Sequence, residues 1–140
     1  MYSFGIVSNK ALNGSVTANP FQFKHYRVSK IEVRHDGKIL CTRPLEPNFT
    51  QKNYLRSYLS LYEATGQLGT KSSHGISYYN YAVGYALWVF DFTLDQVSDE
   101  GHFHPIQSGP MGVELQFAEA LSETVNVILN SEFDSTLEIN

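Results

Sequence analysis

Residues 85–92 have the sequence Tyr-Ala-Leu-Trp-Val-Phe-Asp-Phe, which is apolar almost without a break. A short apolar run of this kind is typical of a β-strand that is covered on both faces. Toward the C-terminus, apolar and polar residues alternate from Val113 to Phe117 and again from Thr124 to Phe133. Period-2 alternation predicts strands with one buried and one wet face. In the second segment Val125, Val127, Leu129 and Phe133 fall on one face, and Asn126, Asn130 and Glu132 fall on the other.

The first forty residues predict further strands. Residues 2–6 alternate large apolar and small side chains, which indicates an N-terminal strand. Residues 28–42 predict a β-hairpin, because Asp36-Gly37 readily takes the positive φ angles of a type I′ turn. On this hairpin Ile31, Val33, Ile39 and Cys41 are expected on the buried face, and Lys30, Glu32 and Arg34 on the exposed face.

One segment breaks the β pattern. Apolar and aromatic residues recur at three- and four-residue spacing over 51–64, after Thr50 as a candidate N-cap and before Gly66 as a candidate C′ residue. We therefore predict an amphipathic helix that packs its stripe across an edge or end of the sandwich, with Lys52 and Arg56 in solvent. A long loop is expected over 65–80. The predicted stripe is Tyr54, Leu55, Tyr58, Leu59, Leu61 and Tyr62.

Composition limits the possible classes of protein. The 140 residues, 42% hydrophobic and 14% aromatic, can bury one core, so a single domain over 1–140 is expected. The net charge of −4 comes without a basic run, which disfavours direct nucleic-acid binding. The lone cysteine, Cys41, excludes an internal disulfide. No apolar run is long enough to span a membrane, and no secretory leader is recognisable. About seven short strands and one inserted helix predict an all-β, antiparallel β-sandwich of the jelly-roll or immunoglobulin kind.

No catalytic constellation is apparent. His102 and His104 with nearby acidic residues could offer metal ligands, but the glutamate that follows such a pair in cupin barrels is missing. Cys41 is expected to face inward, and Ser73-His74 adjacency does not make a triad. We therefore predict no catalytic, cofactor-binding or metal-binding residue, and no enzyme activity. The tyrosine-rich stretch 78–81 is compatible with simple packing, with contacts to a neighbouring protein, or with glycan stacking.

An ordered series of motifs goes further than these patterns. The chain resembles the C-terminal part of a family of virus-like proteins, widespread in animal genomes and associated with Maverick/Polinton elements and related DNA viruses. The resemblance covers nearly the whole chain. It rests on Asn19–Tyr26, Arg43–Phe49, Tyr54–Tyr58 with Thr65-Gly66, Gly84–Thr93, Glu119–Ile128, Glu132–Asp134 and Leu137–Ile139.

The resemblance implies the second jelly-roll of a double jelly-roll major capsid protein, whose longer relatives carry a further N-terminal half. Such proteins are expected to form trimeric capsomers in an icosahedral shell, beside other capsid components such as a penton protein. The implied location is the virion, after synthesis in the host cytoplasm or nucleus. The alternative is a non-catalytic glycan- or receptor-binding β-sandwich module with a concave aromatic site.

Overall fold

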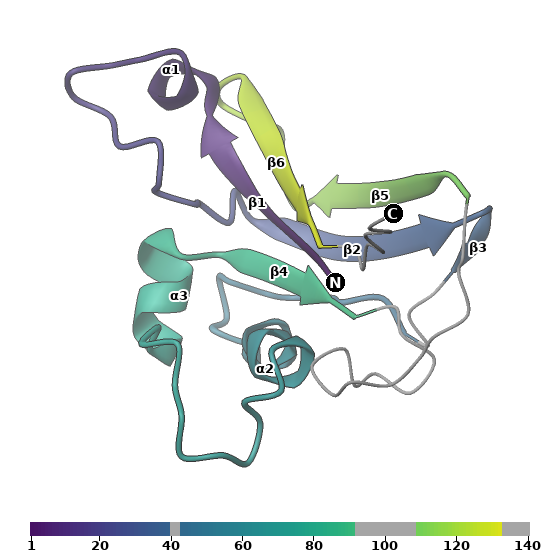
Figure 1. Cartoon of the computed structure of the whole chain (residues 1–140). Helices are drawn as coiled ribbons and strands as arrows, with labels where there is room; N and C mark the ends of the chain where they lie inside the picture. The colour runs from purple at the N-terminus through teal and green to yellow at the C-terminus, as the bar shows by residue number, and fades with distance from the viewer. Residues whose placement is uncertain (40–42, 92–108, 133–140) are drawn as a thin grey trace, which may run out of the picture.

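The computed structural model describes residues 1–39, 43–91 and 109–132, which form two antiparallel three-stranded sheets. The first sheet has the order β4-β1-β6 and the second β3-β2-β5 (Figure 1). The protein is therefore mostly β, which agrees with the prediction of an all-β sandwich. The strands are β1 (Tyr2–Ser8), β2 (Val28–His35), β3 (Lys38–Ile39), β4 (Leu87–Phe90), β5 (Met111–Phe117) and β6 (Val125–Ser131). The helices are α1 (Asn9–Leu12), α2 (Leu55–Ala64) and α3 (Tyr78–Gly84).

The main core lies between the two sheets. Phe4 and Ile6 of β1 lie in the same cluster as Trp88, whose ring is tilted by 30° against that of Phe4 with 5.4 Å between the ring centroids. The second sheet contributes Ile31 and Val33 from β2, as the alternation of the hairpin predicted. Burial of these side chains supplies most of the free energy that holds the two sheets together.

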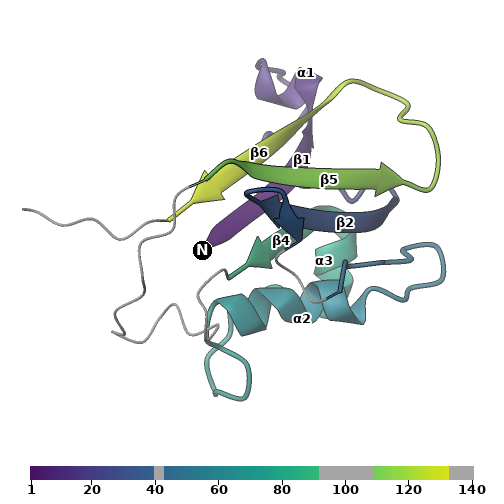
Figure 2. The same cartoon turned by 90° about the vertical axis from the view of Figure 1, so that its right-hand side faces the viewer.

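A second, smaller cluster lies on the outer side of β4. Val89 of β4 packs there with Tyr54, Leu61 and Tyr81. Figure 2 shows α2 on the side of β4 opposite β2. Strand β4 is therefore covered on both faces, which confirms the prediction from its unbroken apolar sequence.

The predicted hairpin turn is confirmed, but Ile39 does not lie on a buried face as expected, since it is 53% exposed. Asp36 and Gly37 both have positive φ, 50° and 74°, as a type I′ turn requires. Glu32 lies on the face opposite Ile31 and Val33, as predicted, but the prediction that it is exposed was wrong, since it is only 5% exposed. Lys30 and Arg34 flank its carboxylate at 3.0 and 2.7 Å, and these contacts lower the pKa of Glu32. The charge is tolerated because two cations accompany it.

Helix α2 begins later than predicted, and its buried face matches the predicted stripe only in part. Thr50 does not cap it; the helix starts after Tyr54, and its C-terminal end is closed at Gly66. There the N–H of Gln67 bonds the carbonyl of Tyr62 in a Schellman arrangement. Tyr54, Leu61, Tyr58 and Tyr62 of the predicted stripe pack in the cluster beside β4. Ser57 and Ser60 are buried as well, whereas Leu55 of the stripe is exposed. Arg56 and Lys52 are exposed, as expected, and the guanidinium of Arg56 also donates to the carbonyls of residues 43 and 44.

Helix α3 was not predicted. Its first residues were assigned to a loop over 65–80, yet Tyr78–Gly84 is helical. Ser77 caps this helix by accepting from the N–H of Asn80 at 3.2 Å. A serine N-cap followed by aromatic residues at three-residue spacing was the local signal that marked it.

Candidate functional site: pocket and open sheet edge

Of the residues weighed above as metal ligands or nucleophiles, His102, His104 and Cys41 lie outside the described residues. Within residues 1–39, 43–91 and 109–132, no group of three or more His, Cys, Asp or Glu side chains is placed to hold a metal ion. Ser73 uses its hydroxyl in a turn, accepting from the N–H of Gly75 at 3.1 Å.

Two histidines are fixed as neutral packing groups. The Nδ1 atom of His25 accepts from the N–H of Arg27 at 2.9 Å, and its ring stacks on Phe49 at 4.0 Å. The Nδ1 atom of His74 accepts from the N–H of Ile76 at 3.2 Å. Because Nδ1 is an acceptor in both, the neutral rings carry their proton on Nε2. Burial, and secondarily the Arg27 charge, lowers the pKa of His25, and burial lowers the pKa of His74.

The tyrosine-rich stretch serves mainly packing. Tyr81 is fully buried, and its hydroxyl donates to the carbonyl of Leu87 at 3.1 Å. Tyr78 stacks on Tyr54 with 4.4 Å between ring centroids. Tyr79 is different, since 73% of it is exposed. Of the interpretations left open for residues 78–81, packing holds for Tyr78 and Tyr81, and an outward contact remains open for Tyr79 alone.

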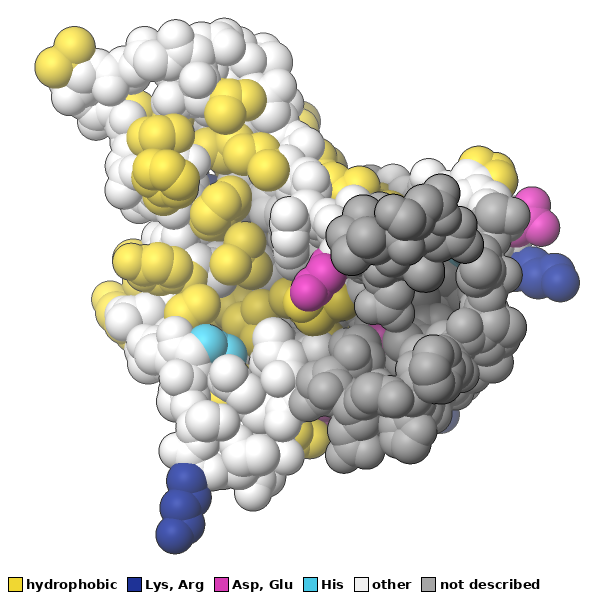
Figure 3. Space-filling model, viewed as in Figure 1, with side chains coloured by type: hydrophobic (Ala, Val, Ile, Leu, Met, Phe, Trp, Pro, Cys, Tyr) yellow, Lys and Arg dark blue, Asp and Glu magenta, His cyan; other side chains and the backbone are white. Residues whose placement is uncertain are grey.

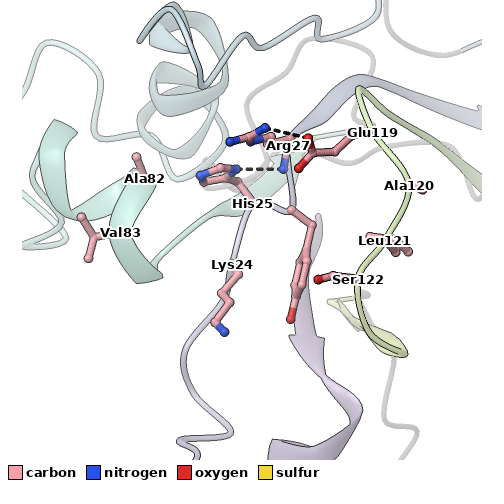
Figure 4. Close-up of a pocket in the computed structure, with 10 residues that line it drawn as sticks. Lys24, His25, Arg27, Ala82, Val83, Glu119, Ala120, Leu121 and Ser122 are labelled. Atoms are coloured by element: carbon pink, nitrogen blue, oxygen red, sulfur yellow. Dashed lines mark hydrogen bonds and ion pairs between the residues drawn. The ribbon is translucent and has the colours of Figure 1, made fainter.

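A pocket of about 310 Å³ lies between α3 and the connection from β5 to β6 (Figure 4). Residues 24–27 form one wall, Ala82 and Val83 another, and residues 119–122 the third. Arg27 and Glu119 close one side with an ion pair of 2.7 Å. Charged and apolar side chains thus line one open depression, as in many ligand pockets.

A hydrogen-bonded carboxylate lies next to this pocket, bonded to Tyr26 of its wall. Glu123 accepts from Tyr26 and from Ser8, each at 2.8 Å. These bonds, that from Ser8 first, lower the pKa of Glu123. Burial, and then the hydrogen bond to Glu123, raise the pKa of Tyr26 to about 12. The carboxylate is therefore ionised and the phenol neutral at pH 7, so neither is prepared to transfer a proton there.

Apolar side chains are exposed over several elements. Figure 3, in the view of Figure 1, shows hydrophobic side chains along the left of the molecule, from the region of α1 to that of α3. In β6, Val127 and Leu129 are 48% and 47% exposed. They pair in register with Ile6 and Phe4, so they lie on the core side of the sheet but beyond the part that the second sheet covers. The open side of the sandwich is the second candidate site.

Comparison with known proteins adds one relative. No family model matches the chain, and no solved structure matches it. The chain is 25% identical over 142 residues to a protein of Caenorhabditis elegans named only as uncharacterized protein F54H12.2. That similarity covers 97% of this chain and 33% of the relative, so the chain spans about a third of the length of the relative. Within the described residues, no helix has the length and apolar character that crossing a bilayer needs.

The sequence did not indicate the pocket or the Glu123 bonds. The carboxylate of Glu123 and the hydroxyl of Ser8 are 115 residues apart, and Tyr26 lies 97 residues from the same carboxylate. No local pattern marks such a contact, because it depends on the pairing of β1 with β6. The exposure of Val127 and Leu129 in β6 has only an indirect sign in the sequence, which is the absence of charged residues from that strand.

Proposed function

We propose that the chain is a structural domain of a viral or virus-like capsid protein, and that it acts without catalysis. In this proposal it forms the second jelly-roll of a double jelly-roll capsid protein. Three copies of that protein make a capsomer beside other components such as a penton protein. The protein would be made in the host cytoplasm or nucleus and reside in the virion, with no direct contact to nucleic acid.

The observation that carries this proposal is the unequal covering of the sandwich. One side of the first sheet is closed by α2, while the side that ends in β6 leaves Val127 and Leu129 half exposed. A sandwich that packs against further β structure needs such an uncovered apolar side. Two further observations support the proposal that the chain is part of a longer protein. They are the order of the sequence motifs and the share of the relative, 33%, that the similarity covers.

Light scattering over a concentration series, followed by electron microscopy, tests the proposal on the 140-residue chain. We expect assemblies whose mass is a multiple of three chains, and particles or sheets of capsomers in the micrographs. A monomer at every concentration, with no higher assembly, would contradict the capsid role.

The glycan- or receptor-binding alternative is favoured by the pocket of about 310 Å³ and its mixed polar and apolar walls. A glycan array with the purified chain tests it, with Ala120→Trp as the variant that fills the pocket. Ala120 lines the pocket and is exposed, so the substitution should leave the fold intact. Saturable binding that Ala120→Trp removes would favour the module, whereas assembly unchanged by Ala120→Trp would favour the capsid.

A further inference from the structure

We propose that β6 pairs with β6 of a second copy of this chain, in antiparallel register about a two-fold axis through Ile128. The pairing joins the two first sheets into one continuous sheet. It does not depend on the capsid role, which concerns a three-fold contact.

The free edge of β6 can be located from its bonds to β1. Glu132 and Met1 exchange backbone hydrogen bonds, and Asn9 donates to the carbonyl of Thr124 at 3.0 Å. In an antiparallel ladder every second residue faces the partner strand. The even-numbered residues of β6 therefore bond to β1, and the N–H and C=O groups of the odd-numbered ones face outward. Within the described residues, β6 has β1 as its one strand partner.

This edge lacks the usual protection against pairing. The described sheets have four edge strands, and three of them are short or carry a charge or glycine. Strand β3 has two residues and includes Lys38, β4 has four residues, and β5 contains Gly112 and Glu114. Strand β6 is seven residues long, with no charge, proline or glycine. Such an edge is prone to accept another strand.

The order of residues in β6 identifies a second copy as the partner. Reversing the strand about Ile128 places Val127 opposite Leu129 and Asn126 opposite Asn130. Like side chains then meet on each face, amide against amide and aliphatic against aliphatic. The outward-facing groups of Val127 and Leu129 become a hydrogen-bonded pair, as the ladder requires. Flanking Glu132 faces Thr124, so no like charges oppose each other in this register.

The gain from pairing lies on the core side of the sheet. Val127 and Leu129 share a face with Ile6 and Phe4, and each is about half exposed in the single chain. In the pair, Val127 of one copy covers Leu129 of the other. Cross-strand aliphatic pairs and the newly bonded edge groups both favour association.

Charge substitutions in the 140-residue chain test the register. The double variant Val127→Lys, Leu129→Lys places like charges opposite each other twice, and should raise the dissociation constant on the order of tenfold or more. The variant Val127→Glu, Leu129→Lys places opposite charges together at the same two pairs and should retain association. Leu55→Lys, at an exposed position of α2 that lines no pocket described above, is the matched control and should change nothing.

Light scattering at matched concentrations gives the readout. We expect wild-type chains to show paired species, either dimers or trimers linked in twos, and the double-lysine variant to halve that mass. Loss of association in both double variants would overturn the register. No pairing in the wild type, or pairing that the lysines leave unchanged, would overturn the proposal. Circular dichroism establishes that each variant is folded. A trimer that survives the lysines keeps the capsid role distinct from this edge.

Discussion

Strands β4 and β6 flank the same central strand, β1, yet they meet different surroundings. Strand β4 has Trp88 buried between the sheets and Val89 buried under the helices. Strand β6 has two half-exposed aliphatic side chains, and its outer edge pairs with no described strand. One side of the same sheet is therefore closed by its own chain, while the other side is available for contact. Stability and association can thus be altered separately.

The largest effect is expected where β4 is closed. Trp88 is fully buried, and replacing it by alanine should cost roughly 3–5 kcal/mol of unfolding free energy through lost burial and a cavity. Urea denaturation followed by circular dichroism measures this loss.

Trp88→Phe sharpens the same test. Within the described residues the indole Nε1 of Trp88 is buried without a hydrogen-bond partner. Phenylalanine removes that unsatisfied donor and keeps most of the apolar volume, so it should cost clearly less than alanine. Equal costs for the two variants would show that the indole donor has a partner or that the site collapses around either residue.

The sequence predicted the elements whose causes are local. Alternation gave β5 and β6, the unbroken apolar run gave β4, and Asp36-Gly37 gave the hairpin. It predicted Tyr54, Tyr58, Leu61 and Tyr62 on the packed side of α2, but not the burial of Ser57 and Ser60, because apolar spacing gives no sign of small polar residues in a helix interface. It predicted that Glu32 is exposed, because alternation cannot show that Lys30 and Arg34 form ion pairs with its carboxylate. The pocket was not predicted, because its walls come from three segments that are distant in the sequence.

The second prediction concerns pH and the closed side of the molecule. His25 and His74 have pKa values below the ordinary value, so the unfolded chain binds protons more readily than the folded one. Their stabilising contribution is fully present above the unfolded pKa of about 6.5, and it is lost as the pH falls through the folded values. The unfolding free energy should therefore decline as the pH is lowered from 7 to 5.

Asparagine variants at the two histidines isolate this effect. In His25→Asn and His74→Asn the side-chain oxygen can accept the same backbone N–H two residues later, without a group that titrates in this range. The pH dependence between 7 and 5 should flatten in the double variant. His35→Asn is the control, because His35 is the last residue of β2, next to the hairpin turn and well separated along the chain from both His25 and His74. An unchanged slope in the double variant would assign the acid sensitivity to other groups.

The third prediction tests the hairpin at the far edge of the second sheet. Gly37 has φ of 74°, and a Cβ there would meet no atom within 4 Å, so alanine would suffer backbone strain alone. Gly37→Ala should cost about 1 kcal/mol. Gly112→Ala is the matched control, since it also has open space but no positive φ, and it should be neutral or slightly stabilising. Comparable losses at both sites would refute the type I′ strain as the cause.

The smallest effect is expected on the open side. Leu129 is 47% exposed, so Leu129→Ala should cost about 1 kcal/mol or less when urea denaturation is followed at concentrations low enough to keep chains apart. The contrast with Trp88→Ala then measures how unequally the two sides of one sheet contribute to stability. If Leu129→Ala instead cost as much as Trp88→Ala in dilute solution, other parts of the same chain would have to cover β6. Its edge would then not be free, and the two-fold pairing would fail together with the proposed open side.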